Sequence, residues 1–458
     1  MTALNWVALA IFVITYVLIF TVEKGRPYIA LASAVVFVVL GIIRVFPEFS
    51  YGPLAALKEI DWNVLMMIAG IMGTVQLFVE SKMPNLISEM LISKVSSLKW
   101  MIVVMSLFAG IVSAFVDNVA TVLMIAPVAL AICAKLGVSP VPMVICVSIS
   151  SNLQGAATLV GDTTSILLAK YAGLDFTDFF FFRGRPGMFW VTEAGAIVSA
   201  LIICFMFRKE NNKIEPFTDR TEVKDKFPGI MLAGTVIALI AVSFIPYKDA
   251  AAPGQFYKPD WTNGALCLLF FFICMVRACV KKRSVIPAQN AIKKGLDLYT
   301  ITLLAGLFVV IGGIKRAGII DLIARGIFDI CGGTTRGALF LTFTIIVWMS
   351  VLVSAFIDNI PYVATMLPVV RSLAAGFAVS SDPSVAGSST ILLYFGLLVG
   401  ATLGGNLTPI GASANVQGIG ILRQAGYTVK AKTFMKYSVP FTLSAVFVGY
   451  ALLWIIWV

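Results

Sequence analysis

Long apolar runs separated by short polar segments dominate this sequence. Ten runs reach the roughly 20 residues that a helix needs to cross a bilayer, and they lie at residues 4–22, 27–45, 62–80, 140–170, 188–207, 229–246, 262–280, 298–314, 388–422 and 437–457. Two further apolar stretches, residues 100–134 and 337–370, each contain one Asp-Asn pair near the middle. The pattern predicts an all-α polytopic membrane protein embedded in a lipid bilayer.

Composition supports a membrane protein and excludes several kinds of chemistry. Of 458 residues, 59% are hydrophobic and 12% are charged, against about 25% charged residues in soluble chains. The chain has no His, its seven Cys form no CxxC pair, and it contains no GxxxxGK[ST] phosphate-binding loop. We therefore expect no enzymatic activity and no cofactor.

The basic residues indicate how the chain is oriented. If both Asp-Asn stretches enter and leave the membrane on one side, ten spans remain and both termini share a face. That orientation places 22 of the 34 basic residues on one face, including most of the basic residues between 208 and 294. The positive-inside rule makes this face cytoplasmic. We expect a multi-pass cell membrane protein with outside termini and a cytoplasmic linker, and the net charge of +11 then reflects topology, with no nucleic-acid partner.

The two halves of the chain resemble each other. IDWNVLMMIAGIM from Ile60 aligns with LDLYTITLLAGLF from Leu296 at an offset of 236 residues, and the Asp-Asn segments align at 241. GAATLVGDTTSILLA from Gly155 is placed opposite GATLGGNLTPIGASANV from Gly400. Five crossings separate the first pair, so the second half is inverted, which is a common plan of secondary transporters.

This alignment predicts a division of the chain into two repeats of about five transmembrane helices each. The first repeat covers residues 1–208, with a re-entrant hairpin at 100–134 and a broken helix at 140–170. A linker at 209–228 joins it to the second repeat at 229–458, whose hairpin is at 337–370 and broken helix at 388–422. The hairpin assignment rests on the twelve residues from Asn359 to Arg371, which as a helix cover only about 18 Å.

Polar residues in the hairpin tips and helix breaks are the candidate site. Backbone that is not helical is tolerated in a membrane only where it lines a cavity or binds an ion. Residues 152–164 and 400–415 are rich in Gly, Thr, Asn and Asp or Pro. We predict that these breaks and the tips form one chamber that binds the ion or substrate through Asp117, Asn118, Thr158, Asp162, Thr163, Asp358, Asn359, Asn406, Thr408, Ser413 and Asn415.

Carboxylates carry most of this prediction, because a charge in a membrane is costly and usually functional. The predicted topology leaves only Asp117, Asp162, Asp358 and Glu193 inside the membrane. Na⁺ could bind near the tip residues, or a proton could exchange with it. The alternative is that each tip carboxylate caps the helix that follows it.

The motifs SAFVDNVATVLMIAP from Ser113, SAFIDNIPYVATMLP from Ser354 and GGNLTPIGASANV from Gly404 resemble the arsenite permease and P-protein branch of the ion transporter superfamily. Members of that branch carry a citrate-transporter-like domain. The resemblance covers about residues 60–441. It implies two inverted repeats, a coupling ion and substrate held at the tips and breaks, a transport domain that slides against a scaffold domain, and a homodimer.

The tip residues depart from one pattern in that superfamily. Its dicarboxylate members carry Ser-Asn-Thr at the tips, whereas this chain has Asp117-Asn118-Val119 and Asp358-Asn359-Ile360. The added carboxylates disfavour a di- or tricarboxylate substrate. Asp162-Thr163-Thr164 also differs from the Pro-containing version of the first break that is common in relatives.

We therefore expect a secondary active transporter that moves a small inorganic ion or oxyanion, such as arsenite, coupled to H⁺ or Na⁺ by an elevator-type mechanism. A Na⁺/H⁺ antiporter without another substrate and a citrate or dicarboxylate carrier are alternatives within transport. An ion channel is an alternative of a different class, and saturable flux would distinguish it.

Overall fold

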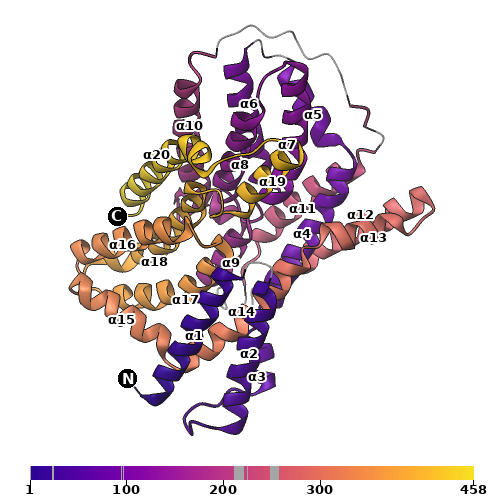
Figure 1. Ribbon diagram of the computed structural model, residues 1–458. Helices are drawn as coiled ribbons and strands as arrows, with labels where there is room; N and C mark the ends of the chain where they lie inside the picture. Colours follow the sequence, from indigo (N-terminus) through magenta and orange to yellow (C-terminus); the bar gives the residue numbers. More distant parts are fainter. Residues whose placement is uncertain are drawn as a thin grey trace.

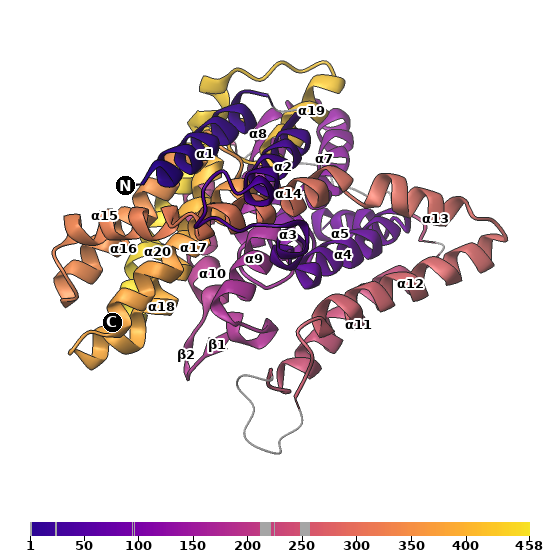
Figure 2. The same cartoon turned by 90° about the horizontal axis from the view of Figure 1, so that it is seen from below.

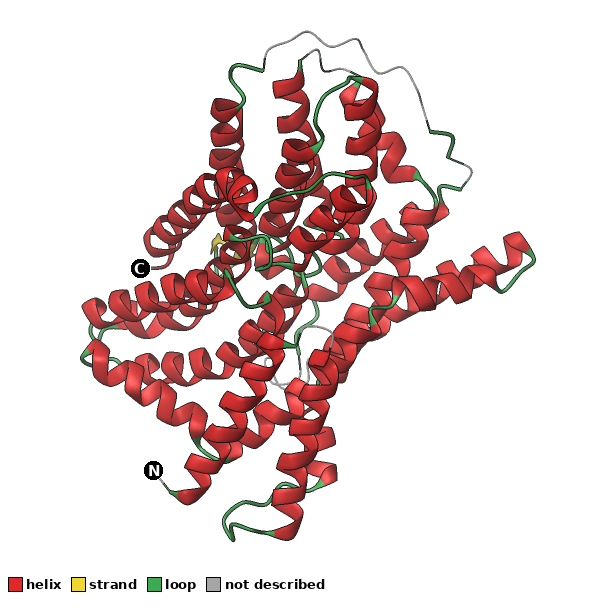
Figure 3. Cartoon of the chain, viewed as in Figure 1, coloured by secondary structure: helices red, strands yellow, loops and turns green. Residues whose placement is uncertain are grey.

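The computed structural model describes residues 2–22, 25–93, 95, 97–210, 221–223, 225–247 and 257–458, and it is almost entirely helical (Figures 1 and 3). The helices before the linker are α1 (Ala3–Thr21), α2 (Arg26–Ile43), α3 (Pro53–Glu59), α4 (Trp62–Glu80), α5 (Met83–Ile92), α6 (Leu98–Ser113), α7 (Asn118–Lys135), α8 (Val141–Gly155), α9 (Thr163–Ala172), the 3-10 turn η2 (Phe176–Phe179) and α10 (Met188–Met206). A two-residue hairpin of β1 (Phe181–Phe182) and β2 (Arg185–Pro186) precedes α10.

The helices after the linker are α11 (Phe227–Ser243), α12 (Thr262–Lys282), α13 (Ile286–Asn290), the π-helical η4 (Ala291–Gly295), α14 (Leu298–Arg316), α15 (Ile319–Cys331), α16 (Arg336–Ser354), α17 (Asn359–Ala378), α18 (Pro383–Leu398), the π-helical η5 (Val399–Leu403), the 3-10 turn η6 (Gly405–Leu407), α19 (Ser413–Gln424) and α20 (Ala431–Trp457).

Ten of the described helices are long and apolar enough to cross a membrane, which confirms the prediction of a polytopic all-α membrane protein. The ten differ in part from the spans expected from the sequence. Both arms of the second Asp-Asn hairpin and the second arm of the first reach full length, whereas α1, α8 and α11 are shorter apolar helices. In α8 the reason is local, because the helix ends at Gly155 where the first break begins.

The two Asp-Asn stretches form helical hairpins, α6–α7 and α16–α17, with the Asp at each turn. The expectation that the second arm of the second hairpin ends near Arg371 is wrong. Helix α17 continues to Ala378 and has 20 residues, which corresponds to about 30 Å. A single Arg is a good helix former and extends its charged end to the surface, so Arg371 does not stop the helix. The depth of the tips in the membrane stays a prediction.

The hairpins pack on the interrupted helices, and a second group of helices lies beside them. Helix α6 packs on α8, α17 on α18, and α7 on both α8 and α19, while α4 packs along α12 and α14 along α2. Figure 2 shows α11–α13 on the side of the molecule opposite α15, α16 and α18. The two hairpins and the interrupted helices that pack on them, α6–α9 and α16–α19, are called the hairpin group. This group and the group of α2, α4, α12 and α14 meet at the candidate site.

The linker lies mostly outside the described residues, but its last part is anchored to helices. Thr221 Oγ1 donates to Glu89 Oε1 at 2.6 Å, and Asp225 pairs with Arg277 at 2.9 Å and with Lys281 at 3.1 Å. Burial alone would raise the pKa of Asp225, but the hydrogen bonds from the Phe227 N–H, Lys281 and Arg277 outweigh it and lower the pKa.

A buried polar cluster joins the segment after α9 to the loop before α12. Lys258 Nζ donates to Asp175 Oδ2 at 2.7 Å and to the Val242 carbonyl at 3.1 Å, and the Lys258 side chain is only 2% exposed. Tyr247 Oη donates to Asp175 Oδ1 at 3.2 Å. Asn263 Nδ2 donates to Tyr247 Oη at 3.2 Å and lies 3.4 Å from Asp175 Oδ1. The full set of bonds compensates for burying the charges.

Replacing Lys258 with Ala leaves the Asp175 carboxylate buried without its cation. We expect the free energy of unfolding to fall by about 3 kcal/mol, measured as a lower thermal unfolding midpoint of the detergent-purified protein. Arg316→Ala is the matched control, because it breaks the more exposed pair with Glu59 and should cost less than about 1 kcal/mol. Equal shifts in the two variants would contradict the structural role of the cluster.

Candidate functional site

Both hairpin tips and both helix breaks meet around one buried amide, that of Asn152 in α8. Asn118 Nδ2 donates to Asn152 Oδ1 at 2.9 Å, and Asn359 Nδ2 lies 3.4 Å from the same oxygen. Asn152 Nδ2 donates to the Thr402 carbonyl at 2.7 Å and to Asn406 Oδ1 at 3.1 Å. Segments up to 288 residues apart in the chain (118 to 406) are thus joined by one side chain. Asn152 was part of a predicted break but not a predicted site residue.

Contacts between the breaks and the tips repeat in the two halves. Thr158 Oγ1 donates to the Ala114 carbonyl in the first hairpin, and Thr408 Oγ1 donates to the Ala355 carbonyl in the second. Each Thr oxygen also accepts from the backbone N–H two residues later, at 3.3 Å in the first half and 3.4 Å in the second. Thr158 and Thr408 are therefore equivalent positions, 250 residues apart.

This equivalence corrects the alignment of the two breaks. Gly155 corresponds to Gly405 and not to Gly400, because Thr158 lies three residues after Gly155 and Thr408 lies three residues after Gly405. Gly400 belongs to the π-helical segment η5. GATL and GAATL match in composition only, because the second repeat has nine more residues than the first between its tip and its break, with an offset of 241 at the tips and 250 at the breaks.

Four helices begin at the centre of the molecule. The first residues of α7, α9, α17 and α19 are Asn118, Thr163, Asn359 and Ser413, and all four line one cavity of about 510 Å³. A helix N-terminus offers unpaired N–H groups and the positive end of a dipole. The residues that precede three of these helices are aspartates.

Each tip carboxylate caps its own helix, as the alternative interpretation expected. Asp117 Oδ2 accepts from the N–H groups of Val119 and Ala120, both at 3.1 Å. Asp358 Oδ1 lies 3.5 Å from the Ile360 N–H. Capping and ion binding are compatible, since an ionised carboxylate has about four lone-pair sites and both carboxylates also line the cavity.

Asp162 faces the cavity from the first break. Its Oδ2 accepts from Thr164 Oγ1 at 2.7 Å, and that hydroxyl lies 3.1 Å from the hydroxyl of Thr402 in the other half. The equivalent position in the second break, 250 residues later, is Ala412. The two breaks therefore differ in charge, although their backbones make matching contacts.

The predicted site residues divide into two groups. Those that line the cavity are Asp117, Asn118, Asp162, Thr163, Asp358, Asn359 and Ser413. Thr158, Asn406, Thr408 and Asn415 lie behind it and hold the breaks in place: Asn406 Nδ2 donates to the Ile149 carbonyl at 2.8 Å, and Asn415 Nδ2 donates to the Gly405 and Thr408 carbonyls at 3.2 Å. The second group shapes the site without facing it.

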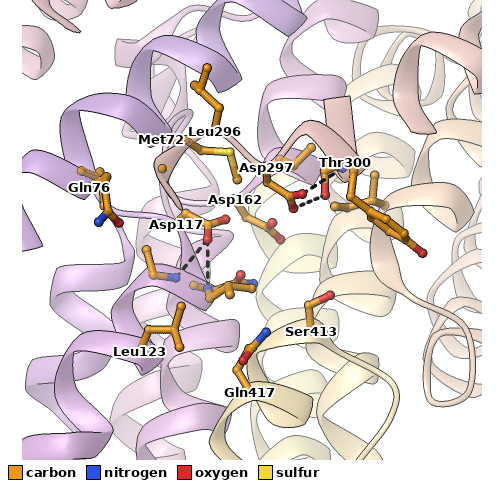
Figure 4. A pocket seen from close by; sticks show the side chains of 18 of the residues that line it. Met72, Gln76, Asp117, Leu123, Asp162, Leu296, Asp297, Thr300, Ser413 and Gln417 are labelled. Atoms are coloured by element: carbon orange, nitrogen blue, oxygen red, sulfur yellow. Dashed lines mark hydrogen bonds between the residues drawn. The ribbon is translucent and has the colours of Figure 1, made fainter. Parts of the chain in front are cut away.

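The cavity also contains charged and polar groups that sequence reasoning did not assign to the site. They are Arg26, Gln76, Lys293, Lys294, Asp297, Thr300 and Gln417, and Figure 4 shows Asp297 beside Asp117 and Asp162. Asp297 caps α14 by accepting from the Thr300 N–H at 3.1 Å. Asp297 aligns with Asp61 in the repeat alignment, and this match between two carboxylates was a signal in the sequence that could have identified Asp297 as a candidate. The sequence around Arg26 contains no motif that assigns it to the site, because one Arg at the start of an apolar run is ordinary for a membrane helix.

Charges around the cavity are nearly balanced, with an excess of acid. Four aspartates and three basic residues line it. The carboxylates of Asp117 and Asp358 already satisfy helix N-termini that would otherwise attract an anion. A small cation or a neutral molecule is therefore easier to accommodate beside them than a polyanion.

Comparison with known proteins identifies the family. Residues 16–390 match the citrate transporter family, CitMHS. The transporter Rv2684 of Mycobacterium tuberculosis is 30% identical over 98% of both chains. The human P protein is 26% identical over 92% of this chain and 56% of its own length.

Two solved transporters have a similar fold at low sequence identity. The Alcanivorax borkumensis YdaH transporter matches with a TM-score of 0.61 at 14% identity, covering 94% of this chain and 98% of its own. Neisseria gonorrhoeae MtrF, described as one of a class of antimetabolite efflux pumps, matches with a TM-score of 0.54 at 13% identity, covering 93% and 94%. The matches to the family model and to the human P protein confirm the resemblance to the ion transporter superfamily, and this membrane transporter belongs to the citrate transporter family.

Proposed function

We propose that the protein is a secondary active transporter that moves a small inorganic ion or oxyanion coupled to H⁺ or Na⁺. The observation that carries the proposal is the convergence of four helix N-termini and the carboxylates of Asp117, Asp162 and Asp358 on one cavity. Intramembrane carboxylates of this kind are typical of ion and proton pathways in transporters. Asn118 and Asn359 lie beside the tip carboxylates and would supply further oxygen ligands for Na⁺.

The charge of the cavity supports a cationic or neutral species more than citrate. A tricarboxylate would have to approach Asp117, Asp162, Asp297 and Asp358 at close range in a medium of low dielectric, where like charges repel strongly. Lys293 and Lys294 at the cavity offer partial compensation, so a citrate or dicarboxylate carrier is the second candidate. The carboxylates of Asp117, Asp162 and Asp358 in the cavity support a Na⁺/H⁺ antiporter without another substrate equally well.

An alternating-access mechanism is supported by the contacts on the two sides of the site. The cavity is lined by the second half of α4, from Met72 to Val79. At the other end of α4, Asp61 pairs with Lys170 of α9 at 3.4 Å, and Asp175 pairs with Lys258. These pairs join the hairpin group to its neighbours on the face opposite the cavity, and an elevator-type movement would break them.

The orientation that we propose follows from the basic residues. Lys293 and Lys294 line the cavity and belong to the face predicted to be cytoplasmic. Gln417 also lines it, from the first half of α19, and the end of that helix, from Arg423 on, is assigned to the same face. The cavity would then open to the cytoplasm, with both termini outside. We also propose the homodimer that the family resemblance implies.

Substitution of each cavity carboxylate tests the coupling role. In liposomes with a trapped pH dye, Asp117→Asn, Asp162→Asn and Asp358→Asn should each reduce coupled flux at least about tenfold, since removing a charge next to a bound cation weakens its binding by that order. Na⁺ gradients are imposed alone and then with arsenite, silicate or citrate. Saturable proton flux with Na⁺ alone would support the antiporter, and flux that needs one solute would identify that substrate.

Glu193→Gln is the matched control for these variants, because Glu193 is a carboxylate of α10 that does not line the cavity. Its flux should stay near that of the unmodified protein. Unchanged coupled flux in all three Asp variants would refute the coupling role. Flux that rises linearly with solute concentration would favour a channel.

Cysteine labelling tests the orientation of the cavity. In a background with Cys204→Ala and Cys279→Ala, the five cysteines that remain are buried. Gln417→Cys should then react with a membrane-impermeant thiol reagent from the cytoplasmic side only. Trp261→Cys, in an exposed position next to the Asn263 end of α12, should react only from outside. Labelling of both from one side would contradict the proposed topology.

A further inference from the structure

An arginine from outside the hairpins holds one of the two tip carboxylates. Arg26 Nη1 donates to Asp358 Oδ2 at 3.3 Å, and the side chains of Arg26 and Asp358 are 15% and 18% exposed. Arg26 Nε donates at 3.0 Å to the Ile19 carbonyl in the last turn of α1. The guanidinium is therefore aimed at Asp358 by a second bond and is not a freely moving surface charge.

The ion pair crosses between the two groups of helices. Arg26 is the first residue of α2, which packs along α14, whereas Asp358 lies at the tip of the α16–α17 hairpin, which packs on α18. Ser413 Oγ of the second break also donates to Asp358 Oδ2, at 2.9 Å. A movement of the hairpins relative to α2 would keep the Ser413 bond and break the Arg26 bond.

The equivalent carboxylate in the first half has no such partner. Within the described part of the chain, no Lys or Arg forms an ion pair with Asp117. Its bonds come from the backbone of its own helix. One tip carries a cation supplied by the protein, and the other does not.

Helix packing explains why the two halves differ here. Gly306 of α14 lies against Ala30 of α2, and Gly70 of α4 lies against Cys267 of α12. These matching contacts make α12 the equivalent of α2, and they place Asn263 at the position that corresponds to Arg26. Asn263 is neutral and bonds to Tyr247 at 3.2 Å on the opposite face.

Space beside the ion pair allows a mobile cation to reach it. Arg26 and Asp358 line both the main cavity and a second hollow of about 240 Å³, together with Tyr299, Ser413 and Gln417. A cation that enters this space meets Asp358 already neutralised by Arg26. It also meets Asp117 and Asp162, with which no Lys or Arg of the described residues forms an ion pair, although Lys293 and Lys294 line the same cavity. Coulomb attraction therefore directs it to the first-half side of the cavity.

We infer that Arg26 is a tethered counter-ion that takes the place of a coupling cation at Asp358, so that only the Asp117 and Asp162 side binds a mobile cation in this conformation. The inference rests on the proposed coupling role of these carboxylates. Arg26 is released from Asp358 when the hairpin moves, and Asp358 then becomes available. The arrangement sets the number of cations bound and keeps the second tip neutral when no cation is present.

Cation binding to the detergent-purified full chain tests the inference without measuring transport. The thermal unfolding midpoint is followed as NaCl replaces choline chloride at constant ionic strength. Arg26→Gln exposes a second carboxylate, so the half-saturating Na⁺ concentration should fall about tenfold and the response should become steeper. Asp358→Asn leaves the Arg26 charge unpaired in the cavity that Asp117 and Asp162 also line, so the half-saturating concentration should rise by a similar factor.

The double variant Arg26→Gln/Asp358→Asn removes both charges and should restore the response of the unmodified protein. Together the four proteins form a double-mutant cycle, and Asp358→Asn with the double variant still decides the matter if Arg26→Gln fails to fold. Arg26→Lys keeps the charge and should behave like the unmodified protein. Arg316→Gln, which breaks the exposed pair with Glu59, should change nothing.

Two results would overturn the inference: a half-saturating concentration that is the same in Arg26→Gln and in the unmodified protein, or a double variant that behaves like Arg26→Gln. The same series run as a pH titration without Na⁺ gives the same order of variants if the mobile cation is a proton. If the unmodified protein responds to neither cation, it is the proposed cation coupling that fails.

Discussion

Four helix N-termini end in the interior of this membrane protein, and the rest of the structure depends on how their unpaired N–H groups are satisfied. Lipid offers no hydrogen bonds, so such ends are tolerated only where side chains, a cavity or an ion complete them. Asp117 and Asp358 cap two of the ends, and Asp162 precedes a third. The positive ends of the helices, in turn, make it less costly to keep carboxylates ionised at this depth.

The same constraint explains the polar network behind the cavity. A break in a helix frees carbonyls as well as N–H groups, and the carbonyls of the two tips are taken up by Thr158 and Thr408. Asn152 then joins both tips to the second break. Buried networks of this kind favour one geometry, and here the hydrogen bonds of Asn152, Thr158 and Thr408 fix how the tips and breaks sit around the cavity.

Near-symmetry makes the differences between the halves informative. The Thr and Gly positions of the breaks and the Asp positions of the tips match, but Asp162 is opposite Ala412, and Arg26 is opposite Asn263. Both extra groups, Asp162 and Arg26, come from the first repeat, but Arg26 pairs with the tip of the second hairpin, so the cation lies at one tip and the extra carboxylate lies in the first break. Under the coupling role that we propose, the two tips would bind a mobile cation with different affinities, because Arg26 neutralises one of them.

The sequence by itself determined the membrane class, the superfamily, the Asp-Asn tips and the location of the breaks. These features are local, since apolar length and a polar residue inside an apolar run are read within about 20 residues. Only the tertiary structure decided that α17 continues past Arg371, that Gly155 matches Gly405, that Thr158, Asn406, Thr408 and Asn415 brace the site instead of lining it, and that Asn152, Asp297 and Arg26 belong to it. Apart from the length of α17, each of these depends on a contact between residues far apart in the chain, as with the 332 residues between Arg26 and Asp358. Local pattern carries no information about such a contact, because packing between helices selects it.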